Sequence, residues 1–458
     1  MRMDTRHLAW MALGSGLLGL SPFKLAPAWD AMPDSVVVTE QVPHLDWTRH
    51  AVIYEVNLRQ YTEAGTLAAF REHLPRLKEL GVDILWFMPL TPIGELNRKG
   101  GMGSYYSVKD YRAIDPASGS LEEFRALVKE IHGLGMHVIV DWVANHCAWD
   151  NHIASEHPEW ITRDAEGNPM PPVPDWSDVI DLDYSQPGLR EYMTGSLEWW
   201  LRETDIDGFR CDVAGLIPFD FWDDARPRLE AVKAVFMLAE WEDPRLHPRA
   251  FDMSYSWAFH NVMNSIARGE RVPAAIDTVI QDFGKFPADA YLMQFVTNHD
   301  ENSWNGTEFE RMGEAVDAMT VLTWTVPGMP LIYSGQEIGL NRRLAFFEKD
   351  PIVWTSSPRE AFHRRLNQLK HDLPVLANGS AGGVFQSLPV PDDRLYAFRR
   401  GSGSGALLAV FNFSDEARSV PAGHPALAGA ALWAADGVEP SGDGIVLPAW
   451  GWALRLEN

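Results

Sequence analysis

Short apolar runs alternate with longer stretches of helical periodicity over much of the chain, from about residue 51 to about residue 340. The stretch over 66–81 has the helical pattern, because its apolar residues recur every three or four positions and share one face. These residues are Leu67, Phe70, Leu74, Leu77 and Leu80. Gly81 follows them directly, and a glycine in that position predicts the end of the helix.

Eight short runs rich in Val, Ile and aromatic residues predict β-strands. The runs start near residues 51, 82, 136, 206, 234, 251, 290 and 329. Strands that are almost continuously apolar and alternate with helices are typical of a parallel sheet covered on both faces. Eight such units predict an α/β fold, a (β/α)8 or TIM barrel, over residues 51–377.

Two regions depart from this rhythm. Residues 147–178, after the third predicted strand, are rich in proline and weakly periodic, which predicts a small loop domain above the barrel. Residues 378–458 contain short strands separated by glycine turns, which predicts a C-terminal antiparallel β-sandwich domain. That domain is expected to shield the barrel rather than to bind starch granules.

The N-terminus has the pattern of an export signal. Arg2 and Arg6 precede a short apolar stretch, and Ala26-Pro27-Ala28 offers small residues for cleavage. Residues 1–28 are therefore predicted to be a signal peptide of an exported protein, and residues 29–50 a linker. The alternatives are a disordered leader and a membrane anchor, but the apolar run is short and broken by glycine, so no stable membrane insertion is expected.

Charge and cysteine content narrow the possible functions. The formal net charge of −24 disfavours nucleic acid and anionic membranes as partners, because both require clustered Lys and Arg. A neutral substrate is compatible with this charge. Two cysteines, Cys147 and Cys211, do not make a disulfide framework.

Polar residues interrupt the apolar strands where four of them end. They are Asp141, Asn145 and His146 after the third strand, Arg210 and Asp212 on the fourth, Glu240 on the fifth, and Asn298, His299 and Asp300 on the seventh. A single Asp in such a position is more often a helix cap or a solvated loop residue. Three acidic residues at three strand ends predict one active site, because these ends meet at the mouth of a barrel.

The spacing of these residues predicts which acid is ionised and which is protonated. Arg210 and Asp212 are two positions apart and point the same way on a strand, so the guanidinium is expected to hold Asp212 ionised. Glu240 follows the apolar segment 236–239, which should favour its protonated form. An ionised carboxylate beside a protonated one is what double-displacement glycoside hydrolysis requires.

At these residues the sequence resembles the α-amylase family of glycoside hydrolases. The matching segments are DWVANH at 141–146, GFRCDVA at 208–214, LAEWE at 238–242 and FVTNHD at 295–300. Segments 81–90, 179–184 and 328–339 look like accessory motifs of the same family. The order and spacing of the seven segments make the resemblance highly specific.

The resemblance implies a role for each matching residue. Asp212 is implied as the nucleophile, Glu240 as the general acid and base, and Asp300 as the group that stabilises the distorted sugar and the transition state. Arg210 would orient Asp212. The residues implied to hold the same sugar are Tyr106, His146 and His299. Trp241, with Trp142 and Trp304, is a candidate sugar platform, although packing is an equally good explanation of each tryptophan.

The resemblance implies hydrolysis of α-1,4-glucosidic bonds in starch-type glucans or maltooligosaccharides, with no organic cofactor. Two alternatives remain: an α-glucosidase or transglycosylase acting on short α-glucosides, and a non-catalytic sugar-binding protein on the same barrel. Many relatives carry a Lys-His pair after the nucleophile, whereas residues 213–216 read Val-Ala-Gly-Leu here, which puts ordinary starch binding in doubt.

Calcium is a further expectation. In many relatives the residues at the positions of Asn145 and Asp181 help to bind a structural calcium ion through oxygen ligands. The same pair also occurs in members without the metal, and Asp181 could equally brace its loop.

Overall fold

The computed structural model describes residues 41–442 and 444–458. The predicted signal peptide and much of the predicted linker lie outside the described residues. The described part of that linker, residues 41–50, packs against the barrel. Trp47 stacks on His137 with ring centroids 3.8 Å apart, and His44 pairs with Asp252 at 2.9 Å.

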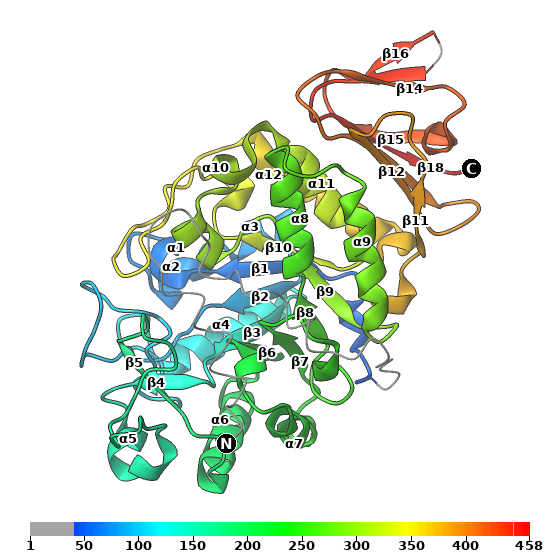
Figure 1. Ribbon diagram of the computed structural model, residues 1–458. Helices are drawn as coiled ribbons and strands as arrows, with labels where there is room; N and C mark the ends of the chain where they lie inside the picture. Colours follow the sequence, from blue (N-terminus) through cyan, green and yellow to red (C-terminus); the bar gives the residue numbers. More distant parts are fainter. Residues whose placement is uncertain (1–40, 443) are drawn as a thin grey trace.

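Eight parallel strands form a closed barrel, in the order β1-β10-β9-β8-β7-β6-β3-β2 (Figure 1). The strands are β1 Ile53–Val56, β2 Ile84–Phe87, β3 His137–Trp142, β6 Gly208–Cys211, β7 Phe236–Ala239, β8 Met253–Tyr255, β9 Tyr291–Gln294 and β10 Met329–Tyr333. Each lies within one of the eight apolar runs. The predicted TIM barrel is therefore confirmed.

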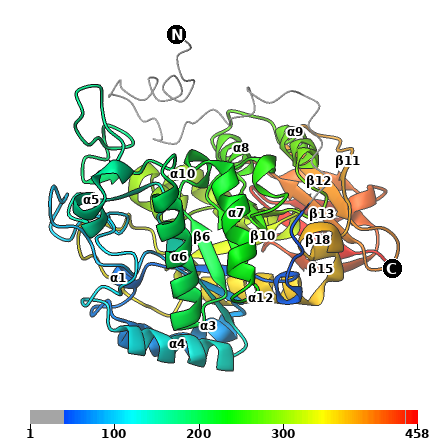
Figure 2. The same ribbon diagram turned by 90° about the horizontal axis from the view of Figure 1, so that it is seen from below.

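Helices surround the barrel on the outside (Figures 1 and 2). Those described are α1 Leu58–Tyr61, α2 Leu67–Arg71, α3 Leu74–Leu80, α4 Leu121–Gly133, α5 His152–Glu156, α6 Pro187–Thr204, α7 Phe219–Glu230, α8 Trp257–Ala267, α9 Ala275–Asp282, α10 Glu308–Met312, α11 Val316–Thr325 and α12 Pro358–Asp372. None of these helices has the length and the hydropathy that a membrane span requires.

The helix predicted over 66–81 is interrupted between α2 and α3. Pro75 lies in the first turn of α3, and a proline ring clashes with the carbonyl four residues earlier, which ends α2 at Arg71. The five apolar residues of the predicted face are all buried on the barrel. Gly81 ends α3 with a φ of 86°, as expected of a glycine cap.

A two-stranded antiparallel sheet follows β3 and carries the loop region. It consists of β4 His146–Ala148 and β5 Val179–Asp181, in a register that pairs His146 with Asp181. Helix α5 lies between these strands in sequence and stands at the edge of the molecule in Figure 1. The loop region is thus attached next to the C-terminal end of β3.

The C-terminal strands form two antiparallel sheets. One contains β11 Phe385–Leu388, β12 Leu395–Arg400, β13 Leu407–Asn412, β18 Trp452–Leu456 and β15 Ala430–Ala434; the other contains β14 Arg418–Pro421, β17 Gly444–Leu447 and β16 Glu439–Ser441. Apolar side chains from both sheets, among them Val410 and Leu447, form one buried cluster, as in a sandwich. This domain lies on the side of the barrel away from α5 (Figure 1).

Candidate active site

The polar residues at the barrel mouth continue the inward-facing series of each strand. Successive side chains on a strand point to opposite faces, so every second residue faces the barrel interior. Ile53, Ile139 and Leu238 belong to the apolar cluster that fills this interior. The residues two positions further along the chain are Glu55, Asp141 and Glu240, and all three are buried. The apolar filling thus gives way to carboxyl groups where the strands end.

Arg210 stands at the centre of these carboxyl groups and is fully buried. Its Nη1 donates to Asp141 Oδ1 and to Asp212 Oδ1, each at 2.9 Å. Its Nη2 lies 2.9 Å from Glu240 Oε1, and its Nε donates to the Tyr255 hydroxyl at 3.3 Å. The predicted nucleophile and the predicted acid/base therefore lie side by side at one guanidinium.

The backbone after β6 strengthens this pairing. Val213 adopts a left-handed conformation with a φ of 37°, and its N–H donates to Glu240 Oε2 at 2.8 Å. This strained position for a β-branched residue turns the chain sharply after Asp212. Retaining glycosidases need their two carboxyl groups about 5–5.5 Å apart, and neighbouring strand ends that share one guanidinium provide such a close arrangement.

Burial dominates the electrostatics of the pair. Burial raises the pKa of Glu240 to about 7, although Arg210 opposes the shift; the negative charge of Asp212 raises it further. Burial also raises the pKa of Asp212 by more than Arg210 lowers it. The sequence predicted that Arg210 favours the ionised form of Asp212. Arg210 does pair with Asp212 and lowers its pKa, but burial opposes this effect, and Asp141 and Glu240 share the same cation.

A second group of contacts lies beside this pair. Burial raises the pKa of Asp300 to about 7, and His299 Nε2 lies 3.3 Å from its Oδ2. The Tyr106 hydroxyl is 2.7 Å from His299 Nε2 and donates to Asp141 Oδ2 at 3.1 Å. The Tyr106 and His299 rings stack with centroids 5.4 Å apart. Tyr106, His299 and Asp300 thus form one wall of the same site.

His146 lies deeper, at the start of β4, and is 3% exposed. Burial lowers its pKa to about 4, so it is neutral at neutral pH. Its ring centroid lies 5.3 Å from that of Trp176. Among the described residues, no hydrogen bond or ion pair joins His146 to the three predicted catalytic carboxyl groups; its ring instead hydrogen-bonds the backbone of Tyr106.

The three tryptophan candidates differ in their surroundings. Trp142 is 2% exposed and packs in the core, so it is not a sugar platform. Trp241 packs over the turn after β6, so closely that a Cβ on Gly215 would come within 2.1 Å of its ring. Trp304 is 42% exposed, lies on η9 Glu301–Asn305 directly after Asp300, and packs on Phe346 with centroids 5.0 Å apart.

Two buried acids were not among the predicted site residues. Asp141 was recognised at its strand end but given no role; besides Arg210 and Tyr106, its carboxylate accepts a hydrogen bond from Trp86 Nε1 at 3.2 Å. Glu55 was missed. Its Oε1 pairs with His299 Nδ1, and its Oε2 has no hydrogen-bond partner among the described residues. A charged residue inside an apolar run, two positions after Ile53, was the signal in the sequence.

The predicted calcium ligands lie next to each other in the loop sheet. Leu182 N–H donates to the carbonyl of Asn145 at 3.1 Å, directly after Asp181. Burial raises the pKa of Asp181 to about 6. The two side chains offer two oxygen ligands of the six to eight that calcium takes, so the calcium site stays a prediction and no step of the chemistry depends on it.

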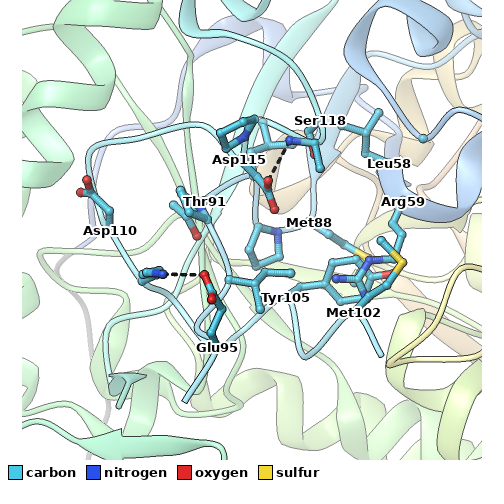
Figure 3. Close-up of a pocket in the computed structure, with 18 of the residues that line it drawn as sticks. Leu58, Arg59, Met88, Thr91, Glu95, Met102, Tyr105, Asp110, Asp115 and Ser118 are labelled. Atoms are coloured by element: carbon cyan, nitrogen blue, oxygen red, sulfur yellow. Dashed lines mark hydrogen bonds and ion pairs between the residues drawn. The ribbon is translucent and has the colours of Figure 1, made fainter. Parts of the chain in front are cut away.

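A cavity of about 750 Å³ lies beside the site but does not contain its carboxyl groups (Figure 3). Arg59, Thr91, Tyr105 and Asp115 are among its lining residues. Tyr105 and Tyr106 are neighbours in sequence, yet only Tyr105 lines this cavity, while Tyr106 contacts Asp141 and His299. The catalytic carboxyl groups are therefore not part of the lining of this cavity.

The sequence matches the family Alpha-amylase, described as the catalytic domain of alpha amylase, over residues 43–167 and 174–354. Similar curated proteins include Alpha-amylase MalA of Haloarcula japonica, 27% identical over 402 residues, and a cyclomaltodextrinase of Thermoanaerobacter pseudethanolicus, 24% identical over 383 residues. The alignments cover 82% and 77% of this chain but only 58% and 64% of these relatives.

Solved structures are similar over nearly the whole chain. An alpha-amylase from Lactobacillus plantarum shows 32% identity and a TM-score of 0.79, and the match covers 90% of this chain and 100% of that one. A maltogenic alpha-amylase, AmyB from Thermotoga neapolitana, shows 30% identity and a TM-score of 0.76, with coverage of 89% and 96%. The chain, with its barrel and its carboxyl groups around Arg210, belongs to the α-amylase family of glycoside hydrolases.

Proposed function

We propose that this protein is a retaining glycoside hydrolase that cleaves α-1,4-glucosidic bonds of starch-type glucans or maltooligosaccharides. One observation supports it most: Asp212 and Glu240 contact adjacent nitrogens of the buried Arg210, beside Asp300. The names of similar proteins, which include a cyclomaltodextrinase and a maltogenic alpha-amylase, support an α-glucan as the substrate class.

In the first step Glu240 gives its proton to the oxygen of the glycosidic bond, and Asp212 attacks the anomeric carbon. The bond to the leaving sugar breaks, and a covalent glycosyl-enzyme on Asp212 forms. A pKa of about 7 leaves Glu240 protonated over much of the neutral and acidic range, as this step requires. Glu240, now ionised, next takes a proton from water, and the resulting hydroxide displaces the sugar from Asp212.

Tyr106, His299 and Asp300, which form one wall of the site, bind the sugar ring whose bond is cleaved. Tyr106 offers its ring as a platform, and His299 and Asp300 offer hydrogen-bond partners for sugar hydroxyl groups. Asp300 forms its strongest contacts when the ring flattens toward the transition state, which lowers the barrier rather than only the Michaelis constant.

Product analysis with maltoheptaose tests the proposal. Release of short maltooligosaccharides of scattered lengths, with retention of the α-anomer, is expected. Products of inverted configuration, or binding of maltoheptaose without any cleavage, would overturn it. Glucose as the first product would indicate an exo-acting α-glucosidase, and products longer than the substrate would indicate a transglycosylase.

Export is proposed as well, on the sequence of residues 1–28 alone. Expression of the full chain in a secreting bacterium, followed by N-terminal sequencing, is the test. A mature protein that begins near Trp29 outside the cytoplasm supports export; an unprocessed chain in the cytoplasm contradicts it.

A further inference from the structure

Three side chains of the types that can bind metals meet at the N-terminal end of the barrel, opposite the carboxyl groups of the active site. His132 lies in the last turn of α4, His137 opens β3, and Asp207 directly precedes β6. Their ligand atoms all lie within 4.8 Å of one another. Among the described residues no other group of three His, Cys, Asp or Glu side chains is so close.

The distances suit a single small cation. His132 Nε2 lies 2.7 Å from Asp207 Oδ2, and His137 Nδ1 lies 3.6 Å from the same oxygen. Ligands about 2.0–2.1 Å from a tetrahedral zinc ion are about 3.4 Å apart. The two observed distances lie on either side of this value; the shorter one is a hydrogen bond between His132 and Asp207, which a bound ion would replace.

His137 carries a nitrogen that the protein itself leaves unsatisfied. Its Nδ1 is buried and has no hydrogen-bond partner among the described residues. Its ring is held by Trp47, which stacks on it at 3.8 Å with an interplanar angle of 11°. A buried polar atom without a partner needs an explanation, and a bound cation supplies one.

The neighbouring charges are compatible with a cation. Lys233 Nζ lies 2.9 Å from Asp207 Oδ1, so Oδ2, which also accepts the N–H of Val138 at 2.8 Å, is the oxygen that faces the two histidines. The same Lys233 also pairs with Asp205 at 2.7 Å. Asp205 Oδ2 lies 3.7 Å from His132 Nδ1, where it can accept the ring proton once Nε2 binds a metal. Carboxylates in this outer position commonly orient metal-binding histidines.

We propose that His132, His137 and Asp207 bind a divalent transition-metal ion of the zinc type, with its remaining coordination position filled by water. Two imidazole nitrogens with one carboxylate favour zinc over calcium, which prefers oxygen ligands. The ion joins the end of α4, the start of β3 and the segment before β6. Its role is structural, because binding to the folded chain alone stabilises that state.

Zinc binding to the purified chain, first dialysed against a chelator, tests this site. His132→Gln keeps a donor toward Asp207, and His137→Phe keeps the stack on Trp47, so both variants should fold. His371→Gln is the matched control, because His371 pairs with a single carboxylate, Asp83, at 2.8 Å. The measurements are calorimetric titration with zinc chloride, metal content, and Tm with and without zinc.

One zinc ion per chain is expected for the wild type and for His371→Gln, with at least tenfold weaker binding in the two site variants. Zinc should raise the Tm of the wild type and of His371→Gln, but not the Tm of His132→Gln or His137→Phe. Cobalt(II) should give the visible spectrum of a tetrahedral site in the wild type and not in the variants. Equal zinc affinity in all four proteins, or no binding by the wild type, would overturn the proposal.

Discussion

Buried carboxyl groups at the two ends of the barrel differ in their partners and in the direction of their pKa shifts. At the C-terminal mouth, Asp141, Asp212 and Glu240 share one cation, Arg210, and the pKa of each is raised. At the N-terminal end, Asp252 has its own partners: Arg226 at 2.8 Å, His44 at 2.9 Å and the N–H of Met237 at 2.8 Å.

All four acids are buried, and burial raises the pKa of each; the difference lies in how strongly the partners of each acid oppose it. Burial alone would raise the pKa of Asp252 as well, but Arg226 and His44 lower it below its ordinary value. Fully partnered acids stabilise the fold, whereas acids that compete for one cation keep protons available for chemistry.

The largest expected effect is at the mouth. Asp212→Asn should lower kcat on maltooligosaccharides by at least about 10⁴-fold, because an amide cannot form the glycosyl-enzyme. Steady-state kinetics and oligosaccharide binding are the measurements. Asp220→Asn is the control, since Asp220 is exposed and only pairs with Arg190, and it should keep full activity. An active Asp212→Asn enzyme would remove this residue from its role.

The next effect is at the opposite end and concerns stability. Asp252→Asn should lower the free energy of unfolding by about 3–5 kcal/mol, because Arg226 loses its buried carboxylate partner. Urea denaturation measures the change, and kcat of the folded protein should stay within about twofold. Asp205→Asn, an exposed acid at the same end, should change stability by less than about 0.5 kcal/mol. Equal losses in both variants would contradict the contrast between the two ends.

A smaller effect is expected from Glu55, which acts through His299 as a positioning residue. Glu55→Gln should lower kcat/KM by about tenfold and shift the pH profile of kcat/KM, because an amide can orient the His299 ring but cannot titrate. Tm should change little. Glu55→Ala should lose more activity than Glu55→Gln. An unchanged pH profile in Glu55→Gln would assign Glu55 to packing alone.

The last effect links the active site to stability. Because the folded pKa of Glu240 is raised, from 4.5 to about 7, its contribution to stability is present below pH 4.5 and is lost as the pH rises toward 7. Glu240→Gln should therefore gain stability relative to the wild type as the pH rises from 4.5 to 7, by up to about 3 kcal/mol. Urea denaturation at pH 5 and pH 8 is the measurement. A difference that does not change with pH would contradict the raised pKa.

The sequence predicted those features that depend on local periodicity. Apolar runs located all eight barrel strands, and the rule that strand ends form the mouth brought Asp212, Glu240 and Asp300 together. The alternation of side chains also placed Arg210 and Asp212 on one side of β6.

Features that depend on distant partners were not predictable in this way. Glu55 pairs with His299, which is 244 residues away in the sequence, and the residues around Glu55 do not predict that partner. The pKa of Asp212 is raised by burial in the assembled barrel, against the effect of Arg210, and a single strand does not reveal that burial. The packing of Trp47 on His137 is likewise a contact between segments far apart in the sequence.

The most direct test of the central claim is to trap the covalent intermediate. A Glu240→Gln variant incubated with an activated α-glucosyl fluoride lacks the base for the second step, so the glucosyl group should accumulate on the protein. Mass spectrometry of its peptides should then find one glucosyl unit on Asp212. A label on Asp141 or Asp300, or no label while the fluoride is consumed, would contradict Asp212 as the nucleophile beside Glu240.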